Sequence, residues 1–313
     1  MNIPVFDLHC DTANELSGFG GVAVSELRRN NAHIDLERAR ELECYAQCFA
    51  CFTSISDKYD PVVAFEKKLA AIIREVEKNP DLIRIAYNAS DIEENKQQGI
   101  MSAILTIEGP AGFGFDPELL QDLHSVGFRI TSLGWNEQNV LTGSHLTGGG
   151  LTDLGKSYVR EAQRLGMLVD VSHISDEGFW DILEITQAPI LATHSNSRAV
   201  CNVSRNLTDE MFSEICKTGG VAGVNLYAAF IGKEATIDTL CDHVMHFLEL
   251  DPSGKHIALG GDLDGCDVLC QGVEGIQDYP LIAEHLITRG LSEKMVRDIF
   301  WNNAMEVFKK CAT

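Results

Sequence analysis

The chain has 313 residues, 45% hydrophobic and 23% charged, and its 25 Lys and Arg against 46 Asp and Glu give a formal net charge of −21. This composition excludes a disordered or fibrous chain, and the negative charge argues against nucleic acid or an anionic membrane surface as a partner. The first residues contain no basic segment followed by a long apolar one, and no run of 18 apolar residues occurs, so we expect a cytoplasmic protein without a secretory signal.

Short apolar runs rich in β-branched residues alternate along the chain with segments of helical periodicity. Eight of these runs indicate strands, at residues 3–9, 45–53, 102–108, 128–134, 167–173, 189–194, 221–227 and 256–262. Three of the helical segments are residues 61–79, residues 151–166 with Thr152 as N-cap and Gly166 at the end, and residues 291–310. This alternation predicts an α/β protein, a (β/α)8 TIM barrel, and the residues at its strand ends, described next, indicate the metal-dependent hydrolase type. Because no linker, repeat or change of composition appears, we expect residues 1–313 to form a single domain.

Candidate metal ligands stand at the ends of four of the apolar runs: His9 and Asp11, Glu108, His173, and His194. In an extended strand alternate side chains share a face, so His9 and Asp11 project together. Barrel enzymes carry their chemistry at the carboxyl ends of the strands, where these five side chains would meet. Imidazole and carboxylate ligands suit zinc, and a set this acidic can hold two ions. Any one of them alone could be a hydrogen-bonded strand-end group, but five in equivalent positions favour a metal site.

Asp262 ends the eighth run, in the sequence GGDLDG, where Gly260, Gly261 and Gly265 allow close backbone approach. At this end of a barrel strand we expect a catalytic carboxylate. The alternative is a structural carboxylate that accepts hydrogen bonds from backbone amides in a glycine turn. For the other histidines we expect surface or core positions: His33, His124, His145, His243, His246, His256 and His285.

Cys44, Cys48 and Cys51 have the C-x3-C-x2-C spacing with which radical enzymes hold an iron–sulfur cluster. Such clusters are held on loops, whereas this segment has the pattern of a buried strand on which Cys44 and Cys48 face one way and Cys51 the other. We therefore expect buried thiols, and keep the cluster as the weaker alternative.

Several longer stretches resemble one family. The chain is similar, essentially from end to end, to the membrane dipeptidase (renal dipeptidase) family, peptidase family M19, and looks like a soluble microbial-type member. The matching stretches are DLHCDTANEL, HIDLERAR, TIEGP, LGMLVDVSHIS, APILATHSNSRAVC, SRNLTDEMF, VNLY, GGDLDG and WNNAMEVF. The 21-residue separation of His173 and His194 also matches, and the whole set is far more specific than any one stretch.

The resemblance implies a binuclear site with two Zn²⁺ ions per chain. His9 and Asp11 would bind one ion, His173 and His194 the other, and Glu108 would bridge them. Two zinc ions lower the pKa of a water between them, which would give a metal-bridging hydroxide as the nucleophile, while one ion polarises the scissile carbonyl.

The resemblance also implies roles for residues around the metals. Asp262 would take the proton of the water and pass it to the leaving amine. Arg205 matches a family arginine that binds the carboxylate of the substrate, a task that suits its planar guanidinium; a surface ion pair with Asp209 or Glu210 is the alternative. Tyr227 matches a position that lines the pocket, although an aromatic residue at a strand end could equally belong to the core.

One departure from the family concerns the oxygen of the scissile carbonyl. The best-known members have a histidine that contacts it, whereas this chain has Trp135, which donates one hydrogen bond and carries no charge. Asn136 or a zinc ion would then supply this stabilisation, or the substrate differs. A smaller departure is Pro110, where the family often has a glycine.

The leading interpretation is therefore a zinc-dependent dipeptidase that hydrolyses small dipeptides, L-Xaa-L-Xaa or L-Xaa-D-Xaa. The alternative is a metal-dependent hydrolase of another small amide or ester on the same barrel, and a third reading is a barrel that keeps its metal but has lost turnover. We expect a small dipeptide as substrate and no nucleic acid or membrane partner; the sequence leaves open whether the chain forms a homodimer.

Overall fold

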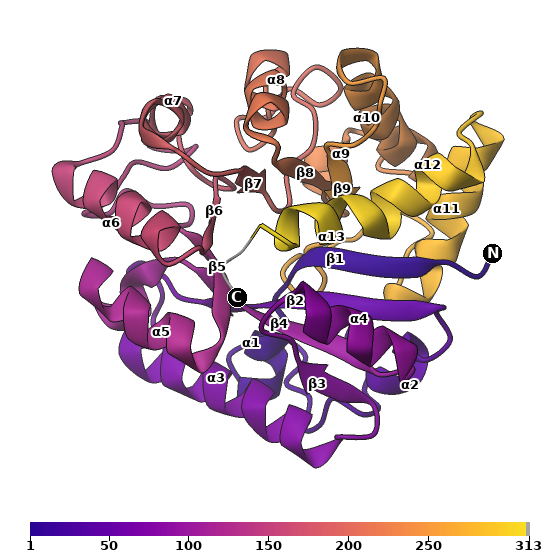
Figure 1. The fold of residues 1–313 in the computed structure, drawn as a ribbon, viewed down its shortest axis with the longest axis horizontal. Helices are drawn as coiled ribbons and strands as arrows, with labels where there is room; N and C mark the ends of the chain where they lie inside the picture. Colours follow the sequence, from indigo (N-terminus) through magenta and orange to yellow (C-terminus); the bar gives the residue numbers. More distant parts are fainter. Residues whose placement is uncertain (311–313) are drawn as a thin grey trace.

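The computed structural model describes residues 1–310, in which parallel strands form a closed ring with helices around it (Figure 1). The strand order is β2-β1-β9-β8-β7-β6-β5-β4-β3, and a further pairing between β2 and β4 closes the ring of eight. The ring strands are β1 (Pro4–Cys10), β2 (Cys44–Phe52), β4 (Met101–Glu108), β5 (Phe128–Ser132), β6 (Leu168–Asp170), β7 (Ile190–Ala192), β8 (Val221–Val224) and β9 (Ile257–Leu259). The prediction of a (β/α)8 barrel is thus confirmed.

A ninth strand, β3 (Ile83–Ile85), was not predicted. It pairs with β4 alone and stays outside the ring. It has only three residues, of which the first is buried, the second exposed and the third half-buried. An apolar run this short does not indicate a strand in the sequence.

Helices cover the outside of the ring (Figure 1). They are α1 (Thr12–Ser17), α2 (Leu36–Ala39), α3 (Pro61–Lys78), α4 (Ala89–Gln97), α5 (Leu120–Val126), α6 (Asp153–Arg164), α7 (Asp176–Ile185), α8 (Asp209–Thr218), α9 (Ala228–Ile231), α10 (Ile237–Leu250), α11 (Tyr279–Thr288), α12 (Glu293–Arg297) and α13 (Asn303–Phe308). Short 3₁₀ turns occupy Pro110–Phe113, Pro117–Leu119 and Ile276–Asp278.

The predicted helices are present, with one difference at the C-terminal end. The helix predicted at residues 61–79 is α3, which ends at Lys78, and α6 begins after Thr152, whose side chain accepts a hydrogen bond from the amide of Gly155 as an N-cap does. The segment 291–310, by contrast, is divided into α12 and α13 by a π-helical turn, Asp298–Asn302.

Two apolar layers hold the barrel together. The interior layer takes side chains from all eight ring strands, namely Phe6, Leu8, Cys44, Ala46, Cys48, Ile104, Ile130, Leu168, Leu191, Val221 and Ala258. Residues of α13 such as Met305 and Phe308 pack against them and close the amino-terminal end of the barrel. The outer layer lies between strands and helices and contains Cys51, so the expectation of buried thiols on opposite faces of one strand is confirmed.

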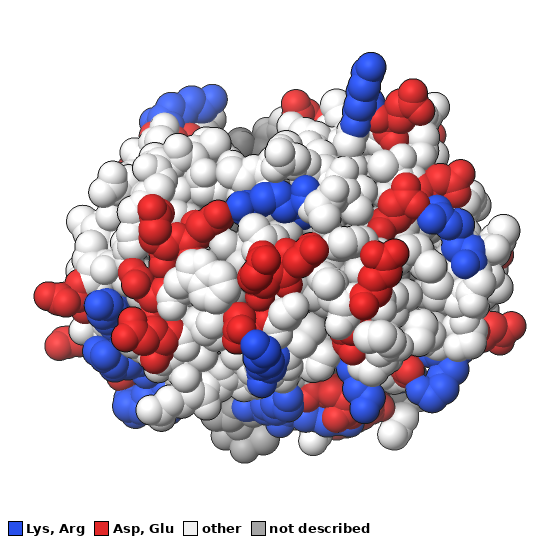
Figure 2. All heavy atoms as spheres, turned by 90° about the horizontal axis from the view of Figure 1, so that it is seen from above, with Lys and Arg blue, Asp and Glu red and all other residues white. Residues whose placement is uncertain are grey.

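The surface reflects the composition. Acidic side chains are spread over the face drawn in Figure 2, and basic side chains lie between them rather than in one patch. Of the helices within residues 1–310, none combines the length and apolar character that a bilayer crossing requires.

Candidate metal centre

The five predicted metal ligands meet at the carboxyl ends of the barrel strands. His9 lies near the end of β1 and Asp11 directly after it, Glu108 ends β4, and His173 and His194 follow β6 and β7. All five side chains are buried. The parallel sheet delivers them to one face of the barrel, as the sequence predicted.

One group of ligands surrounds the Nε2 atom of His9. This atom lies 3.4 Å from Oε2 of Glu108, 3.5 Å from Oδ2 of Asp11 and 3.8 Å from Oδ1 of Asp262. Although burial opposes it, the charges of Glu108 and Asp11 raise the pKa of His9 well above its ordinary value. Three buried carboxylates around a single imidazole form a negatively charged centre that attracts a cation.

The other carboxylate oxygen of Glu108 faces a second pair of histidines. Its Oε1 lies 3.1 Å from Nε2 of His173 and 3.8 Å from Nε2 of His194. The two oxygens of one side chain therefore face two different ligand groups. A carboxylate in this position can bridge two metal ions.

The protonation of His173 and His194 tests whether these residues fit a metal. Nδ1 of His173 lies 2.8 Å from Oδ1 of Asn136, an acceptor, so this nitrogen carries the proton. Nδ1 of His194 lies 2.8 Å from Oγ1 of Thr193, which donates its own proton to Asp170 and so must accept here. Both Nε2 atoms are thus left with lone pairs, and they face each other at 2.9 Å.

Two facing lone pairs repel each other unless a cation lies between them, so this geometry fits a bound metal ion. Two further atoms support a bound metal ion, because Nε2 of His9 and Oε2 of Glu108 are buried and have no hydrogen-bond partner within residues 1–310. Burial also lowers the pKa of His173 and His194 well below the ordinary value, which favours the neutral form that binds metals.

The backbone at the centre is held in an unusual conformation. His173 and Asp262 have positive φ angles of 70° and 56°, which residues with a side chain rarely adopt and which cluster at functional sites. A Cβ atom on Gly265 would lie 2.4 Å from both Oδ2 of Asp11 and Oδ1 of Asp262. Only glycine allows the backbone to pass this close, as the sequence GGDLDG suggested.

The carboxylate of Asp262 accepts a hydrogen bond from a side chain, whereas a structural carboxylate in a glycine turn was expected to accept from backbone amides. Its Oδ2 accepts a hydrogen bond of 3.1 Å from Nδ2 of Asn225, whereas the amide of Gly261 donates to Asp7 instead. Burial raises the pKa of Asp262 to about 6, against the attraction of His9. A carboxyl group that titrates near neutral pH can both accept and return a proton.

Arg205 lies inside the protein, so the alternative of a surface ion pair is wrong. Its side chain is buried, and Nη1 donates to Oγ of Ser195, the residue after His194, at 2.6 Å. Asp209 instead accepts from Nε2 of His246 at 2.8 Å. The Nε and Nη2 atoms of Arg205 have no hydrogen-bond partner in the part of the chain that is described. A buried guanidinium with two open donors is suited to bind an anionic group.

The remaining predicted residues surround the metal ligands. Trp135 is half-buried, and its ring lies 6.2 Å from that of His173 and 5.1 Å from that of Phe52. Asn136 is next to it, but its Oδ1 is already used by His173. Tyr227 packs edge-on against Phe230, which in turn lies 5.6 Å from the guanidinium of Arg205. A direct contact of Trp135, Asn136 or Tyr227 with a substrate stays a prediction.

Sequence analysis missed residues that hold the ligands in place. Asp170 accepts hydrogen bonds from the amide and the hydroxyl of Thr193, at 2.9 and 2.6 Å, and thereby orients His194. A carboxylate within an apolar strand could have been the signal. His145, for which we expected a surface or core position, is half-buried on a loop and bonds to Asn136, the partner of His173; no pattern near it distinguishes it. His243 is buried as expected.

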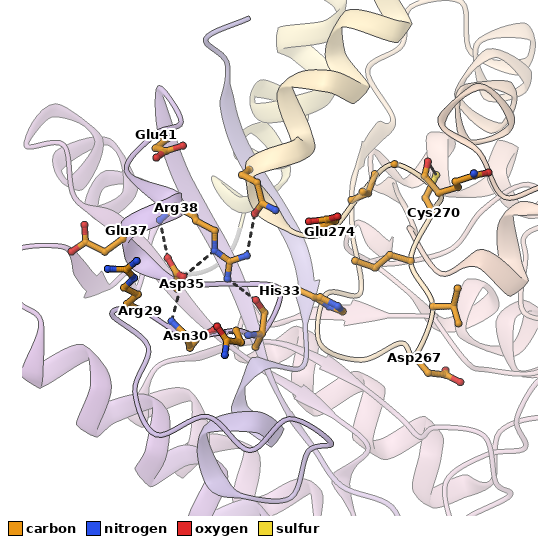
Figure 3. A pocket seen from close by; sticks show the side chains of 18 residues that line it. Arg29, Asn30, His33, Asp35, Glu37, Arg38, Glu41, Asp267, Cys270 and Glu274 are labelled. Atoms are coloured by element: carbon orange, nitrogen blue, oxygen red, sulfur yellow. Dashed lines mark hydrogen bonds and ion pairs between the residues drawn. The ribbon is translucent and has the colours of Figure 1, made fainter.

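A polar cavity of about 960 Å³ lies between residues 29–41 and residues 267–277 (Figure 3). Within its lining, Arg38 forms an ion pair with Asp35 at 2.9 Å and also donates to the side-chain oxygen of Gln277 at 3.1 Å. His33, which lines it, accepts from the amide of Asp264 at 2.8 Å. None of the predicted site residues lines this cavity, so it is separate from the candidate metal centre.

A closed (β/α)8 barrel with buried histidines and carboxylates at the carboxyl ends of its strands defines the class of metal-dependent hydrolases. The family can also be named. The model of the membrane dipeptidase family, peptidase family M19, matches residues 1–313, and the chain belongs to this family of metallo-dipeptidases.

Individual relatives agree with this assignment. An uncharacterised dipeptidase of Schizosaccharomyces pombe is 32% identical over 259 residues, which are 80% of this chain and 63% of the yeast protein. An uncharacterised protein of Klebsiella pneumoniae is 30% identical over 264 residues, 80% of this chain and 97% of that protein. This chain therefore spans less than two thirds of the yeast relative but nearly all of the bacterial one.

Solved structures have the same fold. A metallopeptidase from Rhodobacter sphaeroides, liganded with a phosphinate mimic of the dipeptide L-Ala-D-Ala, superposes with a TM-score of 0.88 at 23% identity, over 100% of both chains. A second, described as dipeptidase AC of family M19, superposes with a TM-score of 0.85 at 25% identity, over 99% of both chains.

Proposed function

We propose that this chain is a zinc-dependent dipeptidase that hydrolyses small dipeptides of the L-Xaa-L-Xaa or L-Xaa-D-Xaa type. The observation that carries the proposal is the position of Arg205. Its Nη1 donates to Ser195, the residue after His194, and its charge is close enough to His173 and His194 to lower the pKa of both, while Nε and Nη2 have no partner among the described residues. A cation would bind the scissile carbonyl of a dipeptide, and the buried guanidinium would bind its C-terminal carboxylate. In a dipeptide a single residue separates these two groups.

We propose that two Zn²⁺ ions bind, one with His9 and Asp11 and one with His173 and His194, with Glu108 bridging them. Nitrogen and oxygen donors of this kind suit zinc. Bound metal of this kind supplies a nucleophile by lowering the pKa of water, and polarises the scissile carbonyl.

The other steps belong to side chains of this chain. Arg205 binds the substrate carboxylate, and Ser195 orients the guanidinium by accepting from Nη1. Oδ1 of Asp262 lies on the same side as the ligand group around His9, while Asn225 holds Oδ2. Asp262 accepts a proton from the attacking water and passes it to the leaving amine, as a carboxylate next to the ligand group can do.

One observation keeps a second candidate open, a hydrolase of another small amide or ester. The indole of Trp135 lies beside His173 and reduces the polarity of the site on that side. A less polar wall would suit a substrate with an apolar acyl group. This enzyme would use the same metals and the same Asp262.

The test is hydrolysis of a panel of L-Xaa-L-Xaa and L-Xaa-D-Xaa dipeptides by zinc-loaded protein, with chelator-stripped protein as the control. Zinc-dependent turnover would support the dipeptidase and identify its stereochemical preference. Absence of turnover on every dipeptide, by protein that has bound two metal ions per chain, would reject it in favour of the second candidate. The cytoplasmic location stays a prediction, and the homodimer stays an alternative that the sequence leaves open.

A further inference from the structure

His145 lies on the long loop that follows β5, and this loop folds back onto the metal centre. The amide of His145 donates to the carbonyl of His173 at 2.9 Å. Nε2 of His145 lies 2.9 Å from Oδ1 of Asn136, the same oxygen that Nδ1 of His173 contacts at 2.8 Å. Its Nδ1 lies 2.9 Å from Oγ of Ser204, the residue before Arg205. One imidazole thus connects a metal ligand to the arginine segment.

The chemistry of the partners fixes the direction of each bond. Oδ1 of Asn136 has two lone pairs and no proton, so it accepts from Nε2–H of His145 and from Nδ1–H of His173. A neutral His145 that donates through Nε2 has a lone pair on Nδ1, which accepts the proton of the Ser204 hydroxyl. The chain of bonds then runs without conflict from Ser204 through His145 and Asn136 to His173, whose Nε2 keeps its lone pair toward His194.

We propose that His145 is a positioning residue that couples the two halves of the site. Through Asn136 it keeps the proton of His173 on Nδ1, and through Ser204 it holds the segment that carries Arg205. This proposal rests on the proposed function only where it concerns the substrate carboxylate. The part that concerns the metal ligand holds for any reaction at this centre.

The alternative is that His145 has a structural role only, packing in its loop and stabilising it. Two substitutions separate these roles. In His145→Gln, the side-chain amide can still donate to Asn136 and its oxygen can still accept from Ser204, whereas His145→Leu fills a similar volume and forms neither bond. The matched control is His285→Leu, because His285 bonds only to the carbonyl of Leu281 in its own helix, α11, among the contacts described.

The first measurement is metal affinity, by competition with a chromogenic zinc chelator. Loss of a residue that orients a ligating histidine costs about 10–100-fold in metal affinity, which we expect for Asn136→Leu. For His145→Leu we expect a smaller loss in the same direction, with His145→Gln close to the wild type and His285→Leu unchanged. Circular dichroism and thermal unfolding of the metal-free variants verify that each is folded.

The second measurement separates KM from kcat on a dipeptide and on the same dipeptide with an amidated C-terminus. In His145→Leu we expect KM to rise for the dipeptide and not for the amide, because only the free carboxylate uses Arg205. Folded His145→Leu with wild-type metal affinity and wild-type KM would overturn the proposal. So would His145→Gln as impaired as His145→Leu. If no variant hydrolyses dipeptides, the proposed function fails, and the chelator competition still decides the role of His145.

Discussion

Replacement of Arg205 by leucine should remove most of the preference of this chain for a substrate with a free C-terminal carboxylate. The guanidinium is buried, and its Nε and Nη2 donors have no partner in the described structure. Both donors are free to form a bidentate pair with a carboxylate, which is the strongest geometry of this type. Leucine keeps much of the apolar volume beside Phe230 and supplies no donor.

The size of the effect follows from the number of bonds. A hydrogen bond to a charged group contributes about 1.5–3 kcal/mol, so two of them contribute about 3–6 kcal/mol. At about 1.4 kcal/mol for each tenfold change, kcat/KM for a dipeptide should fall by about 10²–10⁴. Arg205→Lys keeps the charge but loses the planar pair of donors, so its loss should be intermediate.

The assay compares kcat/KM for a dipeptide and for its C-terminal amide in each variant. The wild type should prefer the dipeptide strongly, and Arg205→Leu should hydrolyse both at similar, low rates. Arg289→Leu is the control, because Arg289 forms an exposed ion pair with Asp242 in which the N–O distance is 2.6 Å. If Arg205→Leu still prefers the dipeptide as the wild type does, the guanidinium does not bind the carboxylate and this reasoning is refuted.

Three more outcomes are expected. Asp262→Asn should lower kcat by about 10²–10⁴ with little change in KM, measured at saturating zinc, and a kcat within tenfold of wild type would contradict the proton-transfer role. Glu108→Ala should bind fewer metal ions per chain by elemental analysis, and an unchanged count would exclude a bridging role. Burial lowers the pKa of His243, which accepts from the Ser197 amide and donates to the Ile231 carbonyl. Below about pH 6.5 the imidazole of residue 243 therefore takes up a proton in the unfolded chain while it stays neutral in the folded one. The metal-free protein should lose stability as the pH falls. Urea unfolding of His243→Gln between pH 5 and 8 should show a shallower dependence than the wild type, and an equal one would contradict it.

The barrel and its ligands could be predicted because both depend on short-range patterns. An apolar run of suitable length gives a strand, and its last polar residue lies at the active face of any parallel barrel. One local irregularity lies outside this reasoning. The pairing register of β1 with β2 shifts between Asp7 and Cys10, and Leu8 packs in the barrel interior while its neighbour His9 also points to the centre. With strict alternation, the side chains of Leu8 and His9 would lie on opposite faces of β1.

The environment of the ligands could not be predicted, because it depends on contacts between distant segments. Asn136 was expected to contact substrate, but its oxygen is shared by two histidines that lie 9 and 37 residues away in sequence. Arg205 is close in sequence to Asp209, which made a surface pair plausible. The start of α8 places Asp209 against His246 instead, 37 residues further on, so the guanidinium is left for the interior.

The unsatisfied atoms of the centre also explain why the substrate should be short. Four of the nine buried side-chain atoms without a partner in residues 1–310 belong to His9, Glu108 and Arg205. Folded chains leave few such atoms, so these four need a cation on one side and an anion on the other. Arg205 donates to Ser195, the neighbour of His194, and its charge lowers the pKa of both His173 and His194, so the guanidinium lies near the proposed metal ligands. One amino acid residue can connect a carbonyl at the metal to a carboxylate at Arg205. If Arg205 binds the substrate carboxylate as we propose, a longer peptide would place an uncharged peptide bond against the buried guanidinium.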